Sequence, residues 1–398
     1  MVLYKLITKD LQRTFEKHER FCGFRGEIAG VNSMESKKKR KWWLAVVVVV
    51  VVAVLAAVGY LAKTYLELEG LLDTGDAGSL PESYQSMTDD NGVDLSQVNE
   101  KDVYTILVAV TDKGVQEKER TGENTDVLMY VRLDNKNHKM NILQIPRDTY
   151  VGDISIDCGV YHRINGAYSN GANKENPIAN TATAIYELLG LKADNYAVLD
   201  VEGFRTMLNV MGGIWMNVPR DIHDKETGKL LFEAGDMKVS GDTAEIILRN
   251  RATSLGDYER LELQQSFYAA VFRTFMEQYP IGDALQVAKN TAVYLNTDMS
   301  VMDLVGLYMA MKELQPEDIY IVRCSGGPIN ITADNGKTAA LYGVEKENTA
   351  RILNENFRPE GVTVSPEQLG LPDVEFNLGY NVDEGKTLGN VATAEIKD

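Results

Sequence analysis

The feature that most constrains this chain is an uninterrupted apolar run from Trp42 to Ala62, WWLAVVVVVVVAVLAAVGYLA, which contains no charged residue. A helix needs about 20 apolar residues to cross the hydrocarbon core of a bilayer. Valine disfavours helices in water, but in lipid the backbone must satisfy its own hydrogen bonds, and a helix does so. Core helices rarely lack charge over such a length, and a cleaved signal peptide would lie nearer the N-terminus. The sequence therefore predicts one transmembrane helix.

Charged residues are divided unequally by this run. Five basic residues at 37–41 stand directly before it, and acidic residues dominate after it. Residues 1–41 hold 11 of the 41 Lys and Arg residues and 5 of the 58 Asp and Glu residues, so the remainder carries 30 against 53, a net charge of −23. Because basic flanks stay in the cytoplasm, we expect a single-pass plasma-membrane protein with a cytoplasmic N-terminus and a large extracellular part. The acidity of that part argues against nucleic acid as a partner.

Composition and pattern divide the chain into five regions. The stretch after the apolar run is rich in Asp, Ser and Gly, which is typical of a linker. A length of 398 residues leaves ample room for a folded domain with its own core. We expect a basic cytoplasmic segment at 1–41, the transmembrane helix at 42–62, an extracellular stalk with a short helix at its start at 63–100, a folded domain at 101–325, and a C-terminal extension at 326–398 that is a small appendage or partly disordered.

Apolar runs of strand length alternate with helical patterns in the folded domain. The first run, VYTILVAV, is continuous, as in a strand buried on both faces, and Gly190 is placed to end a helix that begins at Pro177. Interleaved strands and helices predict an α/β fold with a central mixed β-sheet covered by helices on both faces. Strands are expected at 103–110, 127–133, 140–145, 196–200, 214–218 and, last, 319–324, and helices at 177–189, 201–212, 241–249, 257–279, 281–294, 300–313 and 345–356.

Charged side chains gather at one predicted rim of the sheet. If the first three strands form successive hairpins, their directions alternate, so Asp112, Asp126 and the Pro146-Arg147-Asp148 run share one end of the sheet. Two carboxylates in one place suit a hard divalent cation such as Mg²⁺. Taken singly, each of these charges is more commonly a solvated loop residue or a helix cap.

A second group of basic residues follows within this acidic domain. Arg163 opens the segment RINGAYSNG, and Arg249 and Arg251 are two residues apart. Arg260 and Gln264 are four residues apart and would share one face of a helix. Since the guanidinium fork matches phosphate oxygens, this cluster and the two carboxylates indicate a polyphosphate ligand. The alternative is ordinary surface pairing with the many acidic residues nearby.

The order of several segments resembles the LytR–CpsA–Psr family. They are TILVAVTD, NTDVLMYVRLD, ILQIPRDTYV, RINGAYSNG, GF…GGI and R-N-R…D-Y-E-R…Q-Q, spread over about residues 100–280. Members are single-span proteins whose outer domain transfers glycopolymers to the bacterial cell wall. The resemblance implies a membrane-anchored phosphotransferase that moves an anionic glycopolymer, such as teichoic acid or capsule, from a polyprenyl-diphosphate carrier to peptidoglycan and forms a phosphodiester bond.

Carried over position by position, the resemblance also implies residue roles. Asp112 and Asp126 correspond to the aspartates that hold Mg²⁺ (or Mn²⁺), and with Arg147, Arg249 and Arg251 they make up the implied catalytic set. The residues implied to bind the diphosphate of the substrate are Arg147, Arg163, Arg249, Arg251, Arg260 and Gln264.

The chain also departs from the family pattern. Gln144 replaces the usual Ser before Ile-Pro-Arg-Asp, and Gly114 replaces an Arg, which puts one phosphate contact in doubt. Asp148 is either a general base or a residue that orients Arg147. The lipid tail needs an apolar groove, although apolar helix positions are more often plain core; the candidates are Leu188, Leu189, Phe204, Met207 and Leu208.

The same residues also fit two other functions. A protein of this sequence could be a non-catalytic polyprenyl-phosphate-binding or regulatory protein, or a pyrophosphatase that uses water as its acceptor. Among the three cysteines, Cys22 falls on the cytoplasmic side, whereas Cys158 and Cys324 fall in the exported part. Because disulfides persist in oxidising compartments, we predict that Cys158 and Cys324 are bridged, with two free thiols as the alternative.

Overall fold

A computed structural model describes residues 63–72, 78–100, 102–112, 123–224, 227–249 and 257–391, without the side chains of 245, 248–249 and 257–262. All of these residues lie in one compact unit, Leu61–Asp398. The predicted cytoplasmic segment and the predicted transmembrane helix at 42–62 lie outside the described residues. Of the helices that are described, none combines the length and the apolar character that a bilayer crossing requires.

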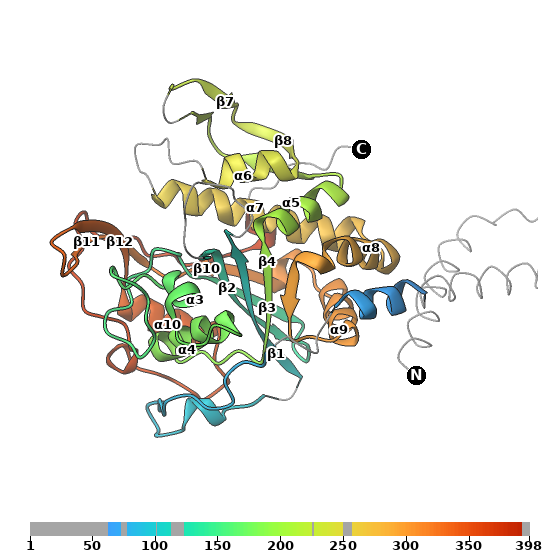
Figure 1. The fold of residues 1–398 in the computed structure, drawn as a ribbon. Coiled ribbons are helices and arrows are strands. Elements are labelled where there is room, and N and C mark those ends of the chain that lie inside the picture. Colours follow the sequence, from blue (N-terminus) through green and yellow to red (C-terminus); the bar gives the residue numbers. More distant parts are fainter. Residues whose placement is uncertain are drawn as a thin grey trace, which may run out of the picture. The chain divides into compact units, whose positions relative to one another are not determined.

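The centre of the described part is a seven-stranded mixed sheet in the order β13-β10-β3-β2-β1-β4-β9 (Figure 1). Its first three strands form two successive antiparallel hairpins, as the turn signals predicted. β4 runs parallel to β1, and β10 runs parallel to β3. The strands are β1 (Val103–Thr111), β2 (Thr125–Asp134), β3 (Lys139–Gln144), β4 (Asn195–Asp200), β9 (Leu295–Thr297), β10 (Ile319–Arg323) and β13 (Lys386–Thr387).

Both faces of this sheet are buried, which explains the continuous apolar strands. Alternate residues of β2 point to opposite faces: Leu128 and Tyr130 enter one core, whereas Met129 and Val131 enter the other. The first core is completed by α4 and α10, and the second by α5, α6, α7 and α8. The predicted coverage of both faces is therefore confirmed.

Helix bounds follow local signals closely. Gly190 adopts φ 62° at the C-cap of α4, where a side chain would be strained. Asp200 caps α5 by accepting from Gly203 N at 2.7 Å, and Ser300 and Asp303 form a capping box on α9. The described helices include one over residues 63–71, then α3 (Gly166–Asn170), α4 (Pro177–Leu189), α5 (Val201–Val210), α6 (Gly241–Arg249), α7 (Asp257–Gln278), α8 (Ile281–Thr291), α9 (Val301–Lys312) and α10 (Lys346–Asn356).

Three small two-stranded ribbons lie outside the central sheet. The strand expected at 214–218 exists but belongs to one of them. The expectation that 319–324 is the last strand was wrong, because three strands follow it, and the shortest has two polar residues and no apolar pattern to reveal it. The ribbons pair β5 (Ile214–Val218) with β8 (Gly235–Val239), β6 (Ile222–His223) with β7 (Leu230–Phe232), and β11 (Gly326–Thr332) with β12 (Thr338–Val344).

The predicted stalk and the predicted C-terminal extension both pack against the folded domain. In the segment expected as a stalk, Leu68 and Leu80 are buried in the compact unit. In the C-terminal part, Ile352 and Leu353 of α10 enter the core beneath the sheet, and β13 pairs with β10. The expected boundary between 325 and 326 thus falls inside the unit Leu61–Asp398. Widely spaced apolar residues in polar stretches give little compositional signal of such packing.

The predicted disulfide is wrong. Cys158 and Cys324 are both free and buried, and both belong to the same apolar core. Burial raises the pKa of each thiol to about 12. The disulfide was predicted because both cysteines fall in the part expected to be exported. That shared location does not show whether the two residues are close enough to form a bond. In the structure the two thiols pack as small apolar side chains.

Candidate functional site

The hairpins bring the predicted carboxylates to one end of the sheet. β1 and β2 pair Val110 with Val127 and Thr111 with Thr125, so Asp126 is the additional residue of a β-bulge. Such a bulge re-aims a side chain at the end of a strand pair. Asp112 lies one residue past β1, where its backbone N donates to Asn124 O at 3.0 Å and its Oδ1 accepts from Asn124 N at 2.7 Å. Backbone pairing therefore fixes both positions.

An arginine–aspartate chain runs along the same rim. Arg147 Nη1 is hydrogen-bonded to Asp126 Oδ1, with side chains 26 % and 15 % exposed. Arg147 Nε lies 3.6 Å from Asp148 Oδ2, and Arg163 Nη1 lies 3.5 Å from Asp148 Oδ1. The Arg163 guanidinium also stacks 5.4 Å from the centre of the Tyr161 ring. Because both Asp148 oxygens face guanidinium groups, this carboxylate is placed to orient the two arginines.

Helix α7 reaches this end of the sheet through a buried amide pair. Gln144 Nε2, at the end of β3, donates to Gln264 Oε1 at 2.9 Å. Gln144 Oε1 is buried and has no hydrogen-bond partner among the described residues. Arg260 lies one turn before Gln264 on the same helix. The predicted spacing of Arg260 and Gln264 on one helix is thus confirmed.

The predicted residues are only partly brought together by the described structure. Asp112, Asp126, Arg147, Arg163 and Gln264 come from the ends of β1, β2 and β3, the loop before α3, and α7. The others lie around the segment 250–256, which is outside the description: Arg249 ends α6, Arg260 is in the first turn of α7, and Arg251 is among the residues not described.

A magnesium ion at this rim would have two carboxylates of the protein as ligands, and bound phosphate or water would have to supply the others. Within the described ranges, no group of three or more His, Cys, Asp and Glu side chains could hold a metal. Asp112 and Asp126, at adjacent ends of paired strands, are the two carboxylates that the sequence predicted as magnesium ligands. Mg²⁺ is commonly held through one or two carboxylates, with water and substrate phosphates completing its octahedron.

A buried arginine that was not among the predicted site residues lies beside them. Arg323 pairs in register with Gln144 across β10 and β3, and its side chain is 3 % exposed. Its Nη2 lies 3.8 Å from Asp383 Oδ2. The sequence did hold a signal, because the apolar strand IYIVRC contains an arginine near its end. A charged residue is rare in a buried strand unless it has a partner.

The apolar helix positions considered for a lipid groove are mainly core. Leu188 and Leu189 are buried on one side of the sheet, and Leu208 is buried on the other. Phe204 and Met207 are partly buried against the second core. The simpler interpretation of these residues as core is therefore correct for the three leucines.

Comparisons with known proteins agree with this fold. The model of the LytR_cpsA_psr family matches residues 76–358. Among curated proteins, the chain is 25 % identical over 251 residues to the Bacillus subtilis "polyisoprenyl-teichoic acid–peptidoglycan teichoic acid transferase TagV", covering 61 % of this chain and 63 % of that protein. It is 27 % identical over 215 residues to TagU of Bacillus mycoides, which has the same transferase name, covering 53 % of this chain and 66 % of that one. The matches thus span just under two thirds of these relatives.

Solved structures show the same fold. The crystal structure of B. subtilis TagV matches with a TM-score of 0.53 at 23 % identity, over 66 % of this chain and 100 % of that one. A structure described as "TagT bound to LI-WTA" matches with a TM-score of 0.51 at 17 % identity, over 74 % and 100 %. At these identities the likeness concerns the fold alone.

Proposed function

The chain belongs to the LytR_cpsA_psr family, and from that premise we propose that it is a membrane-anchored phosphotransferase. It moves an anionic glycopolymer, teichoic acid or capsule, from a polyprenyl-diphosphate carrier to peptidoglycan. The observation that carries the proposal is the rim of the sheet, where Asp112 and Asp126 lie beside the linked Arg147, Asp148 and Arg163. The names of the curated relatives support the same substrate class.

The reaction forms one phosphodiester bond and breaks one phosphoanhydride bond. A peptidoglycan hydroxyl, which we take as the C6 hydroxyl of N-acetylmuramic acid, attacks the sugar-linked phosphorus. The bond from that phosphorus to the bridging oxygen breaks, and polyprenyl phosphate leaves. Such a transfer requires chiefly positioning and neutralisation of charge, since little covalent chemistry falls to the protein.

The residues of the rim divide these tasks. Asp112 and Asp126 would hold Mg²⁺ or Mn²⁺, which supplies charge neutralisation for the diphosphate oxygens. Arg147 and Arg163 offer forked donors to the remaining oxygens, and Asp148 keeps both guanidinium groups aimed at the site. Four more residues complete the proposed diphosphate site: Arg249, Arg251, Arg260 and Gln264.

Anchoring by the apolar run suits this substrate. A helix over 42–62, with the basic residues 37–41 on its cytoplasmic side, would hold the catalytic unit at the outer face of the plasma membrane. The donor is itself a membrane lipid, so the anchor confines enzyme and donor to one surface. The net negative charge of the unit would repel an anionic donor, and the grouped arginines would offset this repulsion at the site.

An assay of polyprenyl phosphate release tests the proposal against its two alternatives. The full chain in detergent micelles is incubated with a polyprenyl-diphosphate oligosaccharide, with and without Mg²⁺ and with and without peptidoglycan. We expect release that requires the metal and is strongly stimulated by peptidoglycan. Binding without release would identify a regulatory lipid-binding protein, and equal release without peptidoglycan would identify a pyrophosphatase.

A further inference from the structure

A segment beyond the family match crosses the end of the sheet beside the site. Residues 381–387, here called the C-terminal strap, follow the matched range 76–358. Asn381 exchanges two backbone hydrogen bonds with Gly326, at 2.9 and 3.0 Å. Tyr320 Oη donates to Glu384 O at 2.7 Å, and β13 then pairs with β10. The strap is therefore held along β10, the strand next to β3.

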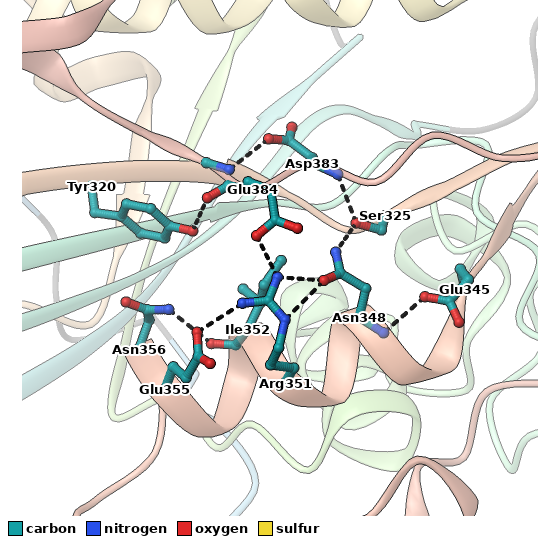
Figure 2. Close-up of polar contacts among 11 residues, drawn as sticks. Tyr320, Ser325, Glu345, Asn348, Arg351, Ile352, Glu355, Asn356, Asp383 and Glu384 are labelled. Atoms are coloured by element: carbon teal, nitrogen blue, oxygen red, sulfur yellow. Dashed lines mark hydrogen bonds and ion pairs between the residues drawn. The ribbon is translucent and has the colours of Figure 1, made fainter.

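One strap residue, Asp383, lies beside Ser325 after β10 (Figure 2) and also reaches α7. Its Oδ2 accepts from Gln265 Nε2 of α7 at 2.9 Å and from Arg323 N of β10 at 3.3 Å. Its own N donates at 2.9 Å to Ser325 Oγ, which also accepts from Asn348 Nδ2 of α10 at 2.6 Å. The Asp383 side chain is only 13 % exposed. The carboxylate thus ties α7 to β10 inside the protein.

The contact of Asp383 lies next to the contact that brings α7 to the site. Gln264 bonds Gln144 of β3, and its neighbour Gln265 bonds Asp383. Gln144 and Arg323 are themselves paired in register across β3 and β10. Two adjacent glutamines, about 100° apart around the helix, therefore fix both the rotation and the axial position of α7 against the sheet.

These two contacts lie near the start of α7, which begins at Asp257. Gln264 and Gln265 are buried and lie within the first three turns of the helix, which also carry Arg260. A small rotation of these turns would displace Arg260 and Gln264 together, and displacements of about 1 Å are enough to impair a positioned site.

We propose that Asp383 is a positioning residue, which holds α7 through Gln265 so that Arg260 and Gln264 meet the diphosphate of the donor; the inference rests on the proposed function. Asp383 itself touches no substrate atom. Its carboxylate is required because both oxygens accept: Oδ1 accepts from Gly385 N at 2.9 Å, and Oδ2 faces the donors of Gln265 and Arg323. An amide would turn a donor toward one of these groups.

The test compares Asp383→Asn with Glu384→Gln in the full chain in detergent micelles. Both changes convert a strap carboxylate to an amide, but the Glu384 side chain is 66 % exposed and bonds only Arg351 among the described side chains. Three quantities are measured: hydrogen exchange of the amides of 257–266, the Kd for geranylgeranyl diphosphate, and the melting temperature. We expect Asp383→Asn to speed exchange in 257–266 at least threefold and to weaken binding at least fivefold, at a temperature where the protein is folded, with no change in either for Glu384→Gln.

The other possible results separate a failure of this inference from a failure of the proposed function. A lower melting temperature with unchanged Kd would make Asp383 merely structural and would overturn the inference, as would unchanged exchange in 257–266. If wild type fails to bind the diphosphate, the proposed function fails, and the exchange result alone then decides whether Asp383 anchors α7. Should Asp383→Asn not fold, Gln265→Met removes the same contact from the other side while Asp383 keeps Arg323, and the same faster exchange is expected.

Discussion

The ion pair between Asp126 and Arg147 should be worth far more than a surface pair. Exposed pairs contribute about 0.2–1 kcal/mol, whereas breaking a fully buried pair costs about 3–5 kcal/mol. With side chains 15 % and 26 % exposed, this pair lies between these limits. We therefore expect Asp126→Asn and Arg147→Gln each to lower the free energy of unfolding by about 2 kcal/mol, in the range for charge-assisted hydrogen bonds.

A double-mutant cycle isolates the pair. The two single variants and the double variant are unfolded in urea, with circular dichroism as the signal, in the compact unit 61–398. We expect a coupling energy of about 1–2 kcal/mol. The matched control is the Arg273–Glu277 pair of α7, 35 % and 41 % exposed at 2.9 Å, for which about 0.3–0.5 kcal/mol is expected. Additivity at Asp126 and Arg147 within about 0.3 kcal/mol, or coupling no larger than the control, would refute the reasoning.

The same Asp126→Asn variant tests the proposed metal role. A neutral amide oxygen is a poorer ligand for Mg²⁺ than a carboxylate, so transfer should slow at least tenfold, equivalent to about 1.4 kcal/mol. A normal rate at limiting Mg²⁺ would contradict the assignment of Asp126 to the metal.

Three further results are expected. Arg260→Lys keeps the charge but loses the fork, so binding of a lipid diphosphate should weaken about tenfold at an unchanged melting temperature; unchanged binding would remove Arg260 from the site. Asp298, one residue past β9, accepts a hydrogen bond from Tyr196 N at 2.9 Å. Burial raises the pKa of its carboxyl group, so the free energy of unfolding falls as pH rises from about 4, the pKa in the unfolded chain, through the higher pKa in the folded protein. The melting temperature of Asp298→Asn should thus exceed that of wild type at pH 7 and converge with it near pH 3; a constant difference would contradict this. Cys158 and Cys324 should resist alkylation at pH 8 until urea is added, because both thiols are buried; a disulfide in non-reducing peptide maps would show otherwise.

The features that were predicted correctly depend on residues close together in the sequence. The strands β1, β2 and β3 are apolar runs separated by turn residues, and α4 lies between Pro177 and a glycine in the left-handed region. The rim formed by Asp112, Asp126 and Arg147 followed from the alternation of hairpin directions, which needs no long-range information.

What the sequence did not predict depends on long-range pairing. β13 has two residues and no apolar period, so only its pairing with β10 makes it a strand. Asp383 and Gln265 are 118 residues apart, and nothing local marks either as a partner. The bulge that re-aims Asp126 is likewise a property of two paired strands, and pattern along one strand does not show it.

Transfer to peptidoglycan can be followed through the phosphate itself. A polyprenyl-diphosphate oligosaccharide, labelled with ³²P in the sugar-linked phosphate only, is incubated with the full chain, Mg²⁺ and peptidoglycan. We expect the label to become covalently bound to peptidoglycan, in equal amount to the unlabelled polyprenyl phosphate released, and we expect Arg147→Ala to abolish both. Label that appears only as a soluble sugar phosphate, or that stays with the lipid, would contradict a transfer to peptidoglycan.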